Sequence, residues 1–248
     1  IEVLYDEDVQ EYDTGNLDRL EDWKERSDLR KMGDGLIGIK TPFKSINGTG
    51  VGWQPGDLIS AFARPTVGKT WLCADIAATS ALKGYKTLFV STEMTKKSID
   101  MRMDVIMANK SGFKLSHRAL RTGSPIDEEK YAKFLSELDD KNLLICDHIS
   151  GEDSISLHSI ANLIRKHAPD ITVIDGVYLV STAMKNSASW EQNHSLFYGL
   201  KNLALAQDTT IMVSTQATRD ASNMFAPPRA DQVAFGDALI RASDLSLI

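Results

Sequence analysis

The sequence predicts an α/β fold in which a mainly parallel, twisted sheet carries helices on both faces. Five short apolar runs, each bounded by turn or polar residues, alternate along the chain with longer segments of helical periodicity. The runs are apolar throughout, as is typical of parallel strands that are buried on both faces. Because strand and helix alternate, helices are expected to return the chain across the sheet between its strands.

The position of each element follows from its length and its flanking residues. The apolar runs lie at residues 58–62, 87–91, 143–146, 171–174 and 210–214. The helical segments lie at about residues 69–83, 95–109, 127–139, 154–167 and 188–206. Before the first run, a glycine-rich stretch at 46–52 predicts a loop, and residues 54–57 predict a turn that leads into the strand.

Residues 1–35 differ in composition from the rest of the chain. They hold 12 of the 34 acidic residues and 5 of the 28 basic ones, so the remainder is close to neutral. Helical spacing of apolar residues predicts an amphipathic helix at 16–32, which needs a docking surface on its own domain or on a neighbouring subunit. These apolar residues are Leu17, Leu20, Trp23 and Leu29. We therefore divide the chain into an acidic segment with a helix, 1–35, and an α/β domain, 36–248.

Length and composition suit one sizeable core, with 248 residues of which 42% are hydrophobic. Cys73 and Cys146 lie far apart in apolar runs, so we expect buried thiols in a reducing compartment. The sequence has neither an apolar run near the ~20 residues that cross a bilayer nor a signal-peptide pattern. We expect a cytoplasmic protein. We also expect a fragment that lacks material at both ends, with the α/β domain truncated at its C-terminus, since the chain starts at Ile1 and stops where a strand begins, at 244–248.

The strand at 58–62 runs directly into a loop with the pattern of a phosphate-binding loop, and then into a helix. Successive backbone N–H groups and the helix N-terminus of such a loop form a nest for anions. Lys69 is expected to reach the β- and γ-phosphates of ATP, and Thr70 to offer its hydroxyl to Mg2+. The first position is Ala rather than Gly, but the flanking strand and helix support the assignment. The residues expected to bind the nucleotide are Ala63, Arg64, Pro65, Thr66, Val67, Gly68, Lys69, Thr70 and Trp71.

Two acidic residues follow buried strands and are candidates for holding the metal and activating water. Asp175 closes the apolar strand at 171–174, which is the Walker B form of a Mg2+-binding carboxylate; the alternative is a turn or helix N-cap residue. Glu93 follows the strand at 87–91, at the carboxyl edge of the sheet, where ligands bind in open α/β folds. We take Glu93 as the general base, although a carboxylate after a strand also suits the start of a helix.

A third strand ends near Gln216, whose amide can both donate and accept hydrogen bonds. Because this strand follows the one that ends in Asp175, Gln216 is expected at the same edge of the sheet. There it would sense the γ-phosphate and pass its presence to the loop that follows. The alternative is an ordinary surface glutamine.

Together these motifs resemble the ATPase domain of DnaB-type replicative helicases of the bacterial and phage group, which has a RecA-like fold. The resemblance covers about residues 36–248, and its most specific parts are the Ala-Arg-Pro form of the phosphate loop and the block Ser91-Thr92-Glu93-Met94. The other matching blocks are Gln54 to Leu58, Met101-Arg102, Leu120 to Gly123, Ile145 to Asp147, Asp175 with Tyr178-Leu179, and Gln216 with Arg219.

This resemblance implies a homo-oligomeric ring, usually of six subunits, that encircles single-stranded DNA and couples ATP hydrolysis at subunit interfaces to translocation and unwinding. The helix at 16–32 would be the linker that docks on the adjacent subunit. A primase or a helicase loader would be a partner. The DNA-contacting loops would be the segments 181–190 and 219–236, and ordinary surface loops are the alternative for both. The candidate DNA contacts are Lys185, Arg219, Arg229 and Gly236.

Two departures from the family pattern qualify the comparison. Bacterial members carry an Asp-Leu-Arg-Glu type motif in the second loop, whereas this chain has Asp231-Gln232-Val233-Ala234-Phe235-Gly236-Asp237, which favours a phage branch. The arginine finger of the family lies on a strand beyond residue 248, so no residue here is assigned that role.

Two other classes of function remain open on the sequence. A recombinase of the RecA/RadA type, or a related RecA-like ATPase that does not unwind DNA, would share the same core. The second class is a non-catalytic, nucleotide-gated scaffold that recruits a primase or loader. The set of Lys69, Thr70, Glu93 and Asp175 argues against the scaffold, since a scaffold has no need of a water-activating carboxylate.

Overall fold

The computed structural model describes residues 16–32, 35–138, 142–147, 155–182, 189–216 and 236–247. Its centre is a six-stranded sheet with the order β3-β2-β4-β5-β1-β6, in which every pair of neighbours is parallel. The strands are β1 Leu58–Ala63, β2 Thr87–Ser91, β3 Leu143–Cys146, β4 Ile171–Asp175, β5 Thr210–Gln216 and β6 Leu245–Leu247. All five predicted strands are confirmed, and so is the strand predicted to begin near residue 244.

The five predicted helices of the α/β domain are also present, with ends that differ by at most three residues. They are α3 Lys69–Leu82, α4 Lys96–Lys110, α6 Glu128–Glu137, α7 Leu157–His167 and α8 Ser189–Ala206. The described residues also form four shorter elements that were not predicted. Each is too short for its sequence to show a clear periodicity. These are α2 Lys44–Asn47, α5 His117–Thr122, η2 Val177–Leu179 and α9 Gly236–Ala242.

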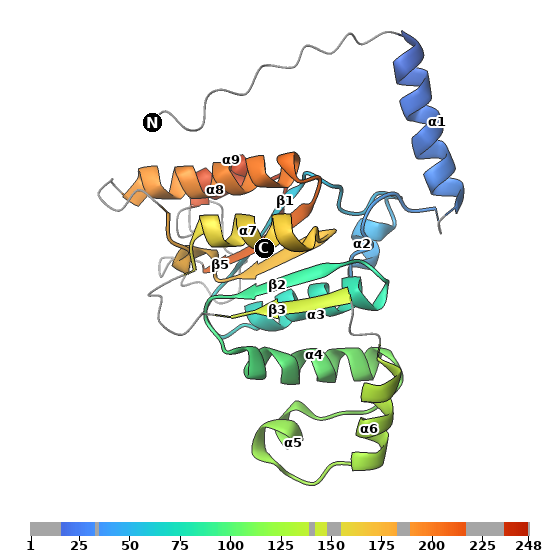
Figure 1. Cartoon of the computed structure of the whole chain (residues 1–248), viewed down its shortest axis with the longest axis vertical. Helices are drawn as coiled ribbons and strands as arrows, with labels where there is room; N and C mark the ends of the chain where they lie inside the picture. Colours follow the sequence, from blue (N-terminus) through green and yellow to red (C-terminus); the bar gives the residue numbers. More distant parts are fainter. Residues whose placement is uncertain are drawn as a thin grey trace.

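Helices cover both faces of the sheet (Figure 1). Side chains of the strands alternate between two buried clusters, because successive residues of a strand point to opposite faces. In β1, Leu58 and Phe62 pack in the cluster formed with α7, α8 and α9. Ile59 and Ala61 pack in the cluster formed with α3 and α4. The sheet is therefore buried on both sides, and its strand ends provide an accessible edge for a ligand.

The glycine-rich stretch at 46–52 was predicted to be a loop, and this prediction is only partly correct. The side chain of Asn47 accepts a hydrogen bond from Thr41 N at 2.9 Å and donates one to the Thr41 carbonyl at 2.8 Å, which stabilises a short helix. Val51 and Trp53 then form isolated bridges with residues of the 35–40 segment. The predicted turn at 54–57 is confirmed, since Asp57 N donates to the Gln54 carbonyl at 3.0 Å.

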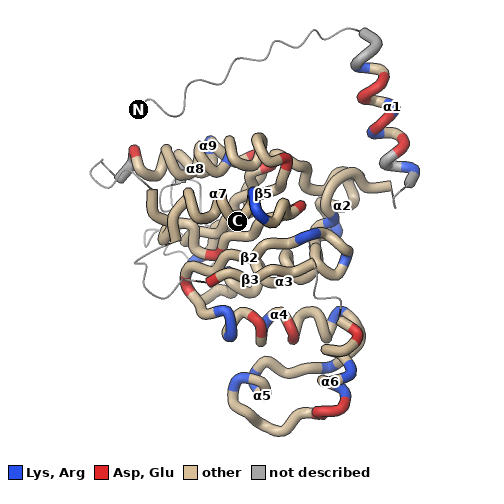
Figure 2. The backbone as a smooth tube through the Cα atoms, in the orientation of Figure 1, with Lys and Arg blue, Asp and Glu red and all other residues tan. Residues whose placement is uncertain are grey.

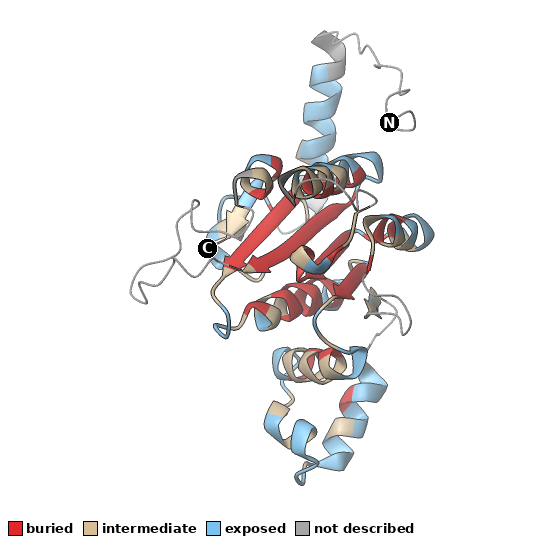
Figure 3. Cartoon of the chain, turned by 90° about the vertical axis from the view of Figure 1, so that its left-hand side faces the viewer, coloured by how far each residue is buried: buried red, intermediate tan, exposed pale blue. Residues whose placement is uncertain are grey.

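The predicted N-terminal helix is confirmed as α1, Asn16–Met32. It projects from the body of the protein (Figure 1), and acidic and basic residues are interspersed along it (Figure 2). Two of its apolar residues, Leu20 and Trp23, are 46% and 60% exposed. The helix is exposed to solvent, whereas the sheet is buried (Figure 3). Within the described ranges, no helix combines the length and apolar character that crossing a membrane requires.

Candidate active site

The predicted site residues meet at one edge of the sheet because their strands are parallel and in register. Asp175, the last residue of β4, pairs with Ser91 of β2 on one side and with Ser214 of β5 on the other. Ala63, at the start of the phosphate loop, pairs with Gln216 on β5. The carboxyl ends of these four strands thus lie at the same edge of the sheet, and β1 and β5 extend two residues beyond the level of Asp175.

The phosphate loop has a left-handed backbone at two of its residues. Gly68 has a φ of 105° and Thr66 a φ of 69°, so the loop turns through the left-handed region just before α3 begins. No side chain caps the N-terminus of α3, so its first backbone N–H groups face the loop. This is the arrangement of a helix N-terminus that binds anions. Val67 at the loop tip is 65% exposed.

Trp71 and Arg102 pack together beside this helix terminus. The Arg102 guanidinium carbon lies 5.5 Å from the centroid of the Trp71 ring, and its Nη1 donates to the Ser98 carbonyl at 2.7 Å. The His117 ring meets Trp71 edge-on at 5.0 Å. Burial, with further contributions from Arg102 and a nearby arginine of α5, holds the pKa of His117 below its ordinary value. Trp71 is therefore held in place by its contacts with Arg102 of α4 and His117 of α5.

Lys69 forms ion pairs with both candidate carboxylates, Glu93 and Asp175. Its Nζ atom donates to Glu93 Oε1 at 2.6 Å and lies 3.9 Å from Asp175 Oδ1. The Lys69 side chain is 8% exposed and that of Asp175 is fully buried, whereas the Glu93 side chain is 25% exposed. Burial acts to raise the pKa of Glu93, but hydrogen bonds from Lys69 and Tyr178 outweigh it, so the pKa lies below its ordinary value.

Among the described residues, the Asp175 carboxylate is hydrogen-bonded through Oδ1 alone. Its Oδ1 accepts a hydrogen bond from Ser214 Oγ at 2.8 Å, and the same Oγ accepts from Gly176 N at 2.9 Å. Its Oδ2 is buried, and among the described residues it has no hydrogen-bond partner. A buried carboxylate oxygen without a donor is costly unless a cation completes its coordination.

Gln216 reaches the site through Tyr178, a residue for which the motifs predict no role. Its Nε2 donates to the hydroxyl of Tyr178 at 2.6 Å, and that hydroxyl donates to Glu93 Oε1 at 2.6 Å. The structure therefore brings together Lys69, Glu93, Asp175 and Gln216, as the sequence predicted, with Tyr178 between two of them.

Sequence reasoning missed the contribution of two residues, Tyr178 and Ser214. Ser214 is a buried polar residue near the end of an apolar strand next to Asp175, a pattern that could have suggested a contact with the carboxylate. Tyr178 lies on a one-turn 3-10 helix, and no periodicity in the sequence indicates which way its side chain points. Three candidate DNA contacts, Lys185, Arg219 and Arg229, lie outside the described residues. Gly236 begins α9 and so lies in a helix rather than in a loop.

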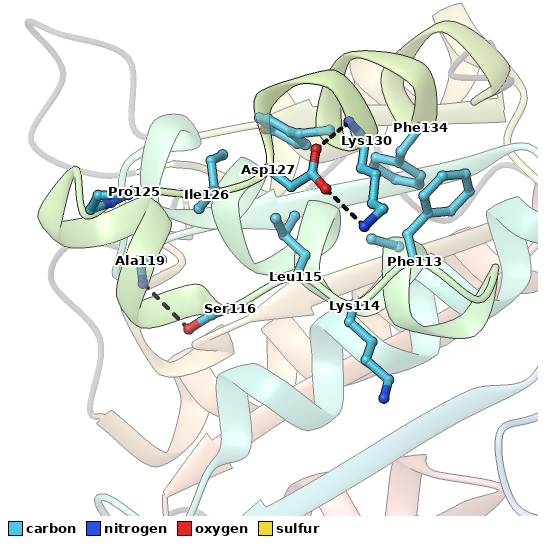
Figure 4. Close-up of a pocket in the computed structure, with 12 residues that line it drawn as sticks. Phe113, Lys114, Leu115, Ser116, Ala119, Pro125, Ile126, Asp127, Lys130 and Phe134 are labelled. Carbon is cyan, nitrogen blue, oxygen red and sulfur yellow. Dashed lines mark hydrogen bonds and ion pairs between the residues drawn. The ribbon is translucent and has the colours of Figure 1, made fainter.

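A cavity of about 210 Å³ lies away from this site, between the C-terminal end of α4 and helices α5 and α6 (Figure 4). Phe113, Leu115 and Phe134 line its apolar side. Asp127 and Lys130 form an ion pair at its rim, with 2.8 Å between the carboxylate and the ammonium group. No residue of the phosphate loop lines this cavity.

The parallel sheet, the phosphate loop and the carboxylates at one edge define a RecA-like domain of the P-loop NTPase class. The family model described as the DnaB-like helicase C-terminal domain matches residues 38–229. The chain belongs to that family.

Individual relatives and solved structures agree with this assignment. The chain is 28% identical to the replicative DNA helicase DnaB of Pasteurella multocida over 199 residues, covering 77% of the chain and 41% of the relative. It is 30% identical to the DnaB helicase of Haemophilus influenzae over 149 residues, covering 58% of the chain and 31% of the relative. The chain thus spans less than half the length of these relatives.

Two solved structures share the fold. One is a DnaB-like replicative helicase, studied with its interactions with primase, which superposes with a TM-score of 0.79 at 19% identity and covers 95% of this chain and 57% of that one. The other is an ATPase domain with the same TM-score and identity, which covers 95% of this chain and 83% of that one.

Proposed function

We propose that this chain is the motor domain of a replicative DNA helicase, which hydrolyses ATP at subunit interfaces to translocate on single-stranded DNA and unwind duplex. Family membership supports the class. The observation that carries the proposal is the contact of Lys69 with Glu93 beside Asp175, because a phosphate-binding lysine and two carboxylates are the parts that ATP hydrolysis requires.

The nucleotide would lie on the phosphate loop, residues 63–70, with Trp71 in the first turn of the helix. The residues present also fit a Mg2+ ion. Asp175 Oδ2 is a buried acceptor without a donor among the described residues, and Thr70 follows Lys69 in the first turn of α3. Oxygen ligands of this kind are those that Mg2+ prefers. When bound, Mg2+ would neutralise phosphate charge and orient the β- and γ-phosphates.

Three side chains would then act on the reaction. Glu93 would orient the attacking water and accept its proton, which requires an ionised carboxylate. Lys69 would leave Glu93 to bind the phosphates and neutralise developing charge. Gln216 would bind the γ-phosphate through its amide. Because Lys69 pairs with Glu93 here, nucleotide binding would itself release the base.

The assembly and the division of the chain belong to the same proposal. Residues 36–248 would form the ATPase domain of a hexameric ring, and residues 1–35 would contain the linker, with α1 docking on the adjacent subunit. Exposed apolar side chains on α1 support a docking role. The segments 181–190 and 219–236 would contact DNA in the central channel, and a primase or loader would bind the ring. Such a protein would work in the cytoplasm of a bacterium or a phage-infected host.

ATPase turnover measured with and without single-stranded DNA, alongside the mass in solution with ATP, tests this function. We expect DNA to stimulate hydrolysis, and Glu93→Gln to retain ATP binding while turnover falls at least about 100-fold, as for loss of a general base. Glu137→Gln, at an exposed residue of α6, is the matched control. Wild-type turnover in Glu93→Gln would overturn the assignment of the base. An intact protein that pairs homologous strands and does not unwind a fork would be a recombinase instead.

A further inference from the structure

The turn that follows Asp175 places Tyr178 against the end of β2. Gly176 has a φ of 94°, and a side chain there would collide with Thr92 and Glu93. The Thr92 hydroxyl lies 2.8 Å from the carbonyl oxygens of both Asp175 and Gly176, which share its one proton, and Thr92 N donates to the Asp175 carbonyl at 3.2 Å. Contacts with Thr92 therefore fix where Tyr178 lies relative to Glu93.

Tyr178 contacts three of the proposed catalytic side chains, which come from α3, from the segment after β2 and from β5. Its hydroxyl donates to Glu93 and accepts from Gln216, each at 2.6 Å. Lys69 Nζ lies 5.1 Å from the centroid of its ring. Burial and the Glu93 carboxylate raise the pKa of Tyr178 well above its ordinary value, so the phenol keeps its proton and remains a donor.

Of these contacts, the one with Lys69 would change on nucleotide binding, because Lys69 would turn to the phosphates. The amide of Gln216 has two N–H groups, so one can reach the γ-phosphate while the other stays on the Tyr178 hydroxyl. The Tyr178 hydroxyl already donates to Glu93, and Tyr178 follows a turn that is tied to Thr92 at the end of β2. It is therefore the donor that stays on Glu93 Oε1 after Lys69 has left.

We propose that Tyr178 is a positioning residue for ATP hydrolysis, and that its hydroxyl couples Gln216 to Glu93. The inference rests on the proposed function of Lys69, Glu93 and Gln216. In the loaded site, Tyr178 holds one carboxylate oxygen of Glu93 and leaves the other to the attacking water. The bond from Gln216 occupies an acceptor position of the hydroxyl and directs its proton to Glu93.

Tyr178→Phe tests the proposal, because it removes the hydroxyl and keeps the ring beside Lys69. In the intact protein with single-stranded DNA, we expect kcat to fall about tenfold and KM for ATP to change less than about twofold, as for the loss of one hydrogen bond to a reacting group. Tyr131→Phe is the matched control: the Tyr131 hydroxyl donates to Asp104 at 2.6 Å, and Tyr131 lines the cavity to which no residue of the phosphate loop contributes. We expect that control to leave kcat unchanged.

A double-mutant cycle with Gln216→Ala tests the coupling. In the wild type, Gln216→Ala should lower kcat. In the Tyr178→Phe background the same substitution should lower kcat by a factor that is at least about threefold smaller, because the two residues act through one hydrogen-bonded chain. Independent effects would overturn the coupling, and unchanged kcat in Tyr178→Phe, or a rise in KM alone, would overturn the positioning role. An inactive wild type would instead refute the proposed function from which the inference starts.

Discussion

Ser214 illustrates how one small residue supports a buried charge. It accepts from Gly176 N and donates to Asp175 Oδ1, so a single hydroxyl satisfies two groups inside the sheet. Asp175 is fully buried, and its second oxygen has no donor among the described residues. A site that binds a cation keeps such a carboxylate at a cost to stability.

Ser214→Ala should lower the free energy of unfolding by about 1–3 kcal/mol, because it leaves Gly176 N–H and one oxygen of Asp175 without a partner. Chemical denaturation without nucleotide measures this. Ser136→Ala is a matched control, since the Ser136 hydroxyl donates to the Lys133 carbonyl on an exposed helix turn. Equal stability of the two variants would show that the Ser214 bridge contributes nothing.

At the scale of elements, the strand ends and the turns after them position the side chains of the proposed active site. β2, β4 and β5 bring Ser91, Asp175 and Ser214 to one level. The turn at Gly176 then returns the chain over β2, where it meets Thr92 and Glu93. This close approach is possible only because residue 176 has no side chain.

Gly176→Ala should therefore lower both stability and turnover. The added Cβ would collide with Thr92 Oγ1 and lie 3.0 Å from Glu93 Oε1, at a φ of 94° that L-residues disfavour. We expect a loss of about 2–3 kcal/mol in unfolding free energy and a lower kcat. Gly84→Ala is the control, because its φ of 87° is similar but a Cβ there meets nothing within 4 Å. A loss no larger than that of Gly84→Ala would contradict steric crowding at the site.

At the scale of the whole molecule, α1 stands apart from the compact domain (Figure 3). Its apolar side chains, Leu20 and Trp23, are largely exposed, whereas the sheet is buried on both faces. The sequence left open whether this helix docks on its own domain or on a neighbouring subunit. In this structure Leu20 and Trp23 remain exposed, which supports docking on a neighbour in the proposed ring.

Replacing Leu20 and Trp23 together by Ala should leave thermal unfolding of the α/β domain nearly unchanged, because exposed substitutions cost within about 0.5 kcal/mol. The mass in solution with ATP, measured by light scattering, should fall from that of a ring to smaller species. Lys24→Ala on the same helix is the control and should keep the assembly. A double variant that still forms the wild-type assembly would remove α1 from the interface.

The sequence by itself determined the parallel α/β fold, the phosphate loop and the choice of Lys69, Glu93, Asp175 and Gln216. Apolar runs that alternate with helices fix which segments become strands, and parallel strands bring their carboxyl ends to one edge, so each residue could be placed from its own strand. Only the tertiary structure decided which side chains touch across those ends. Tyr178 sits on a one-turn helix whose direction depends on Gly176 and Thr92, and that direction has no signature in local periodicity.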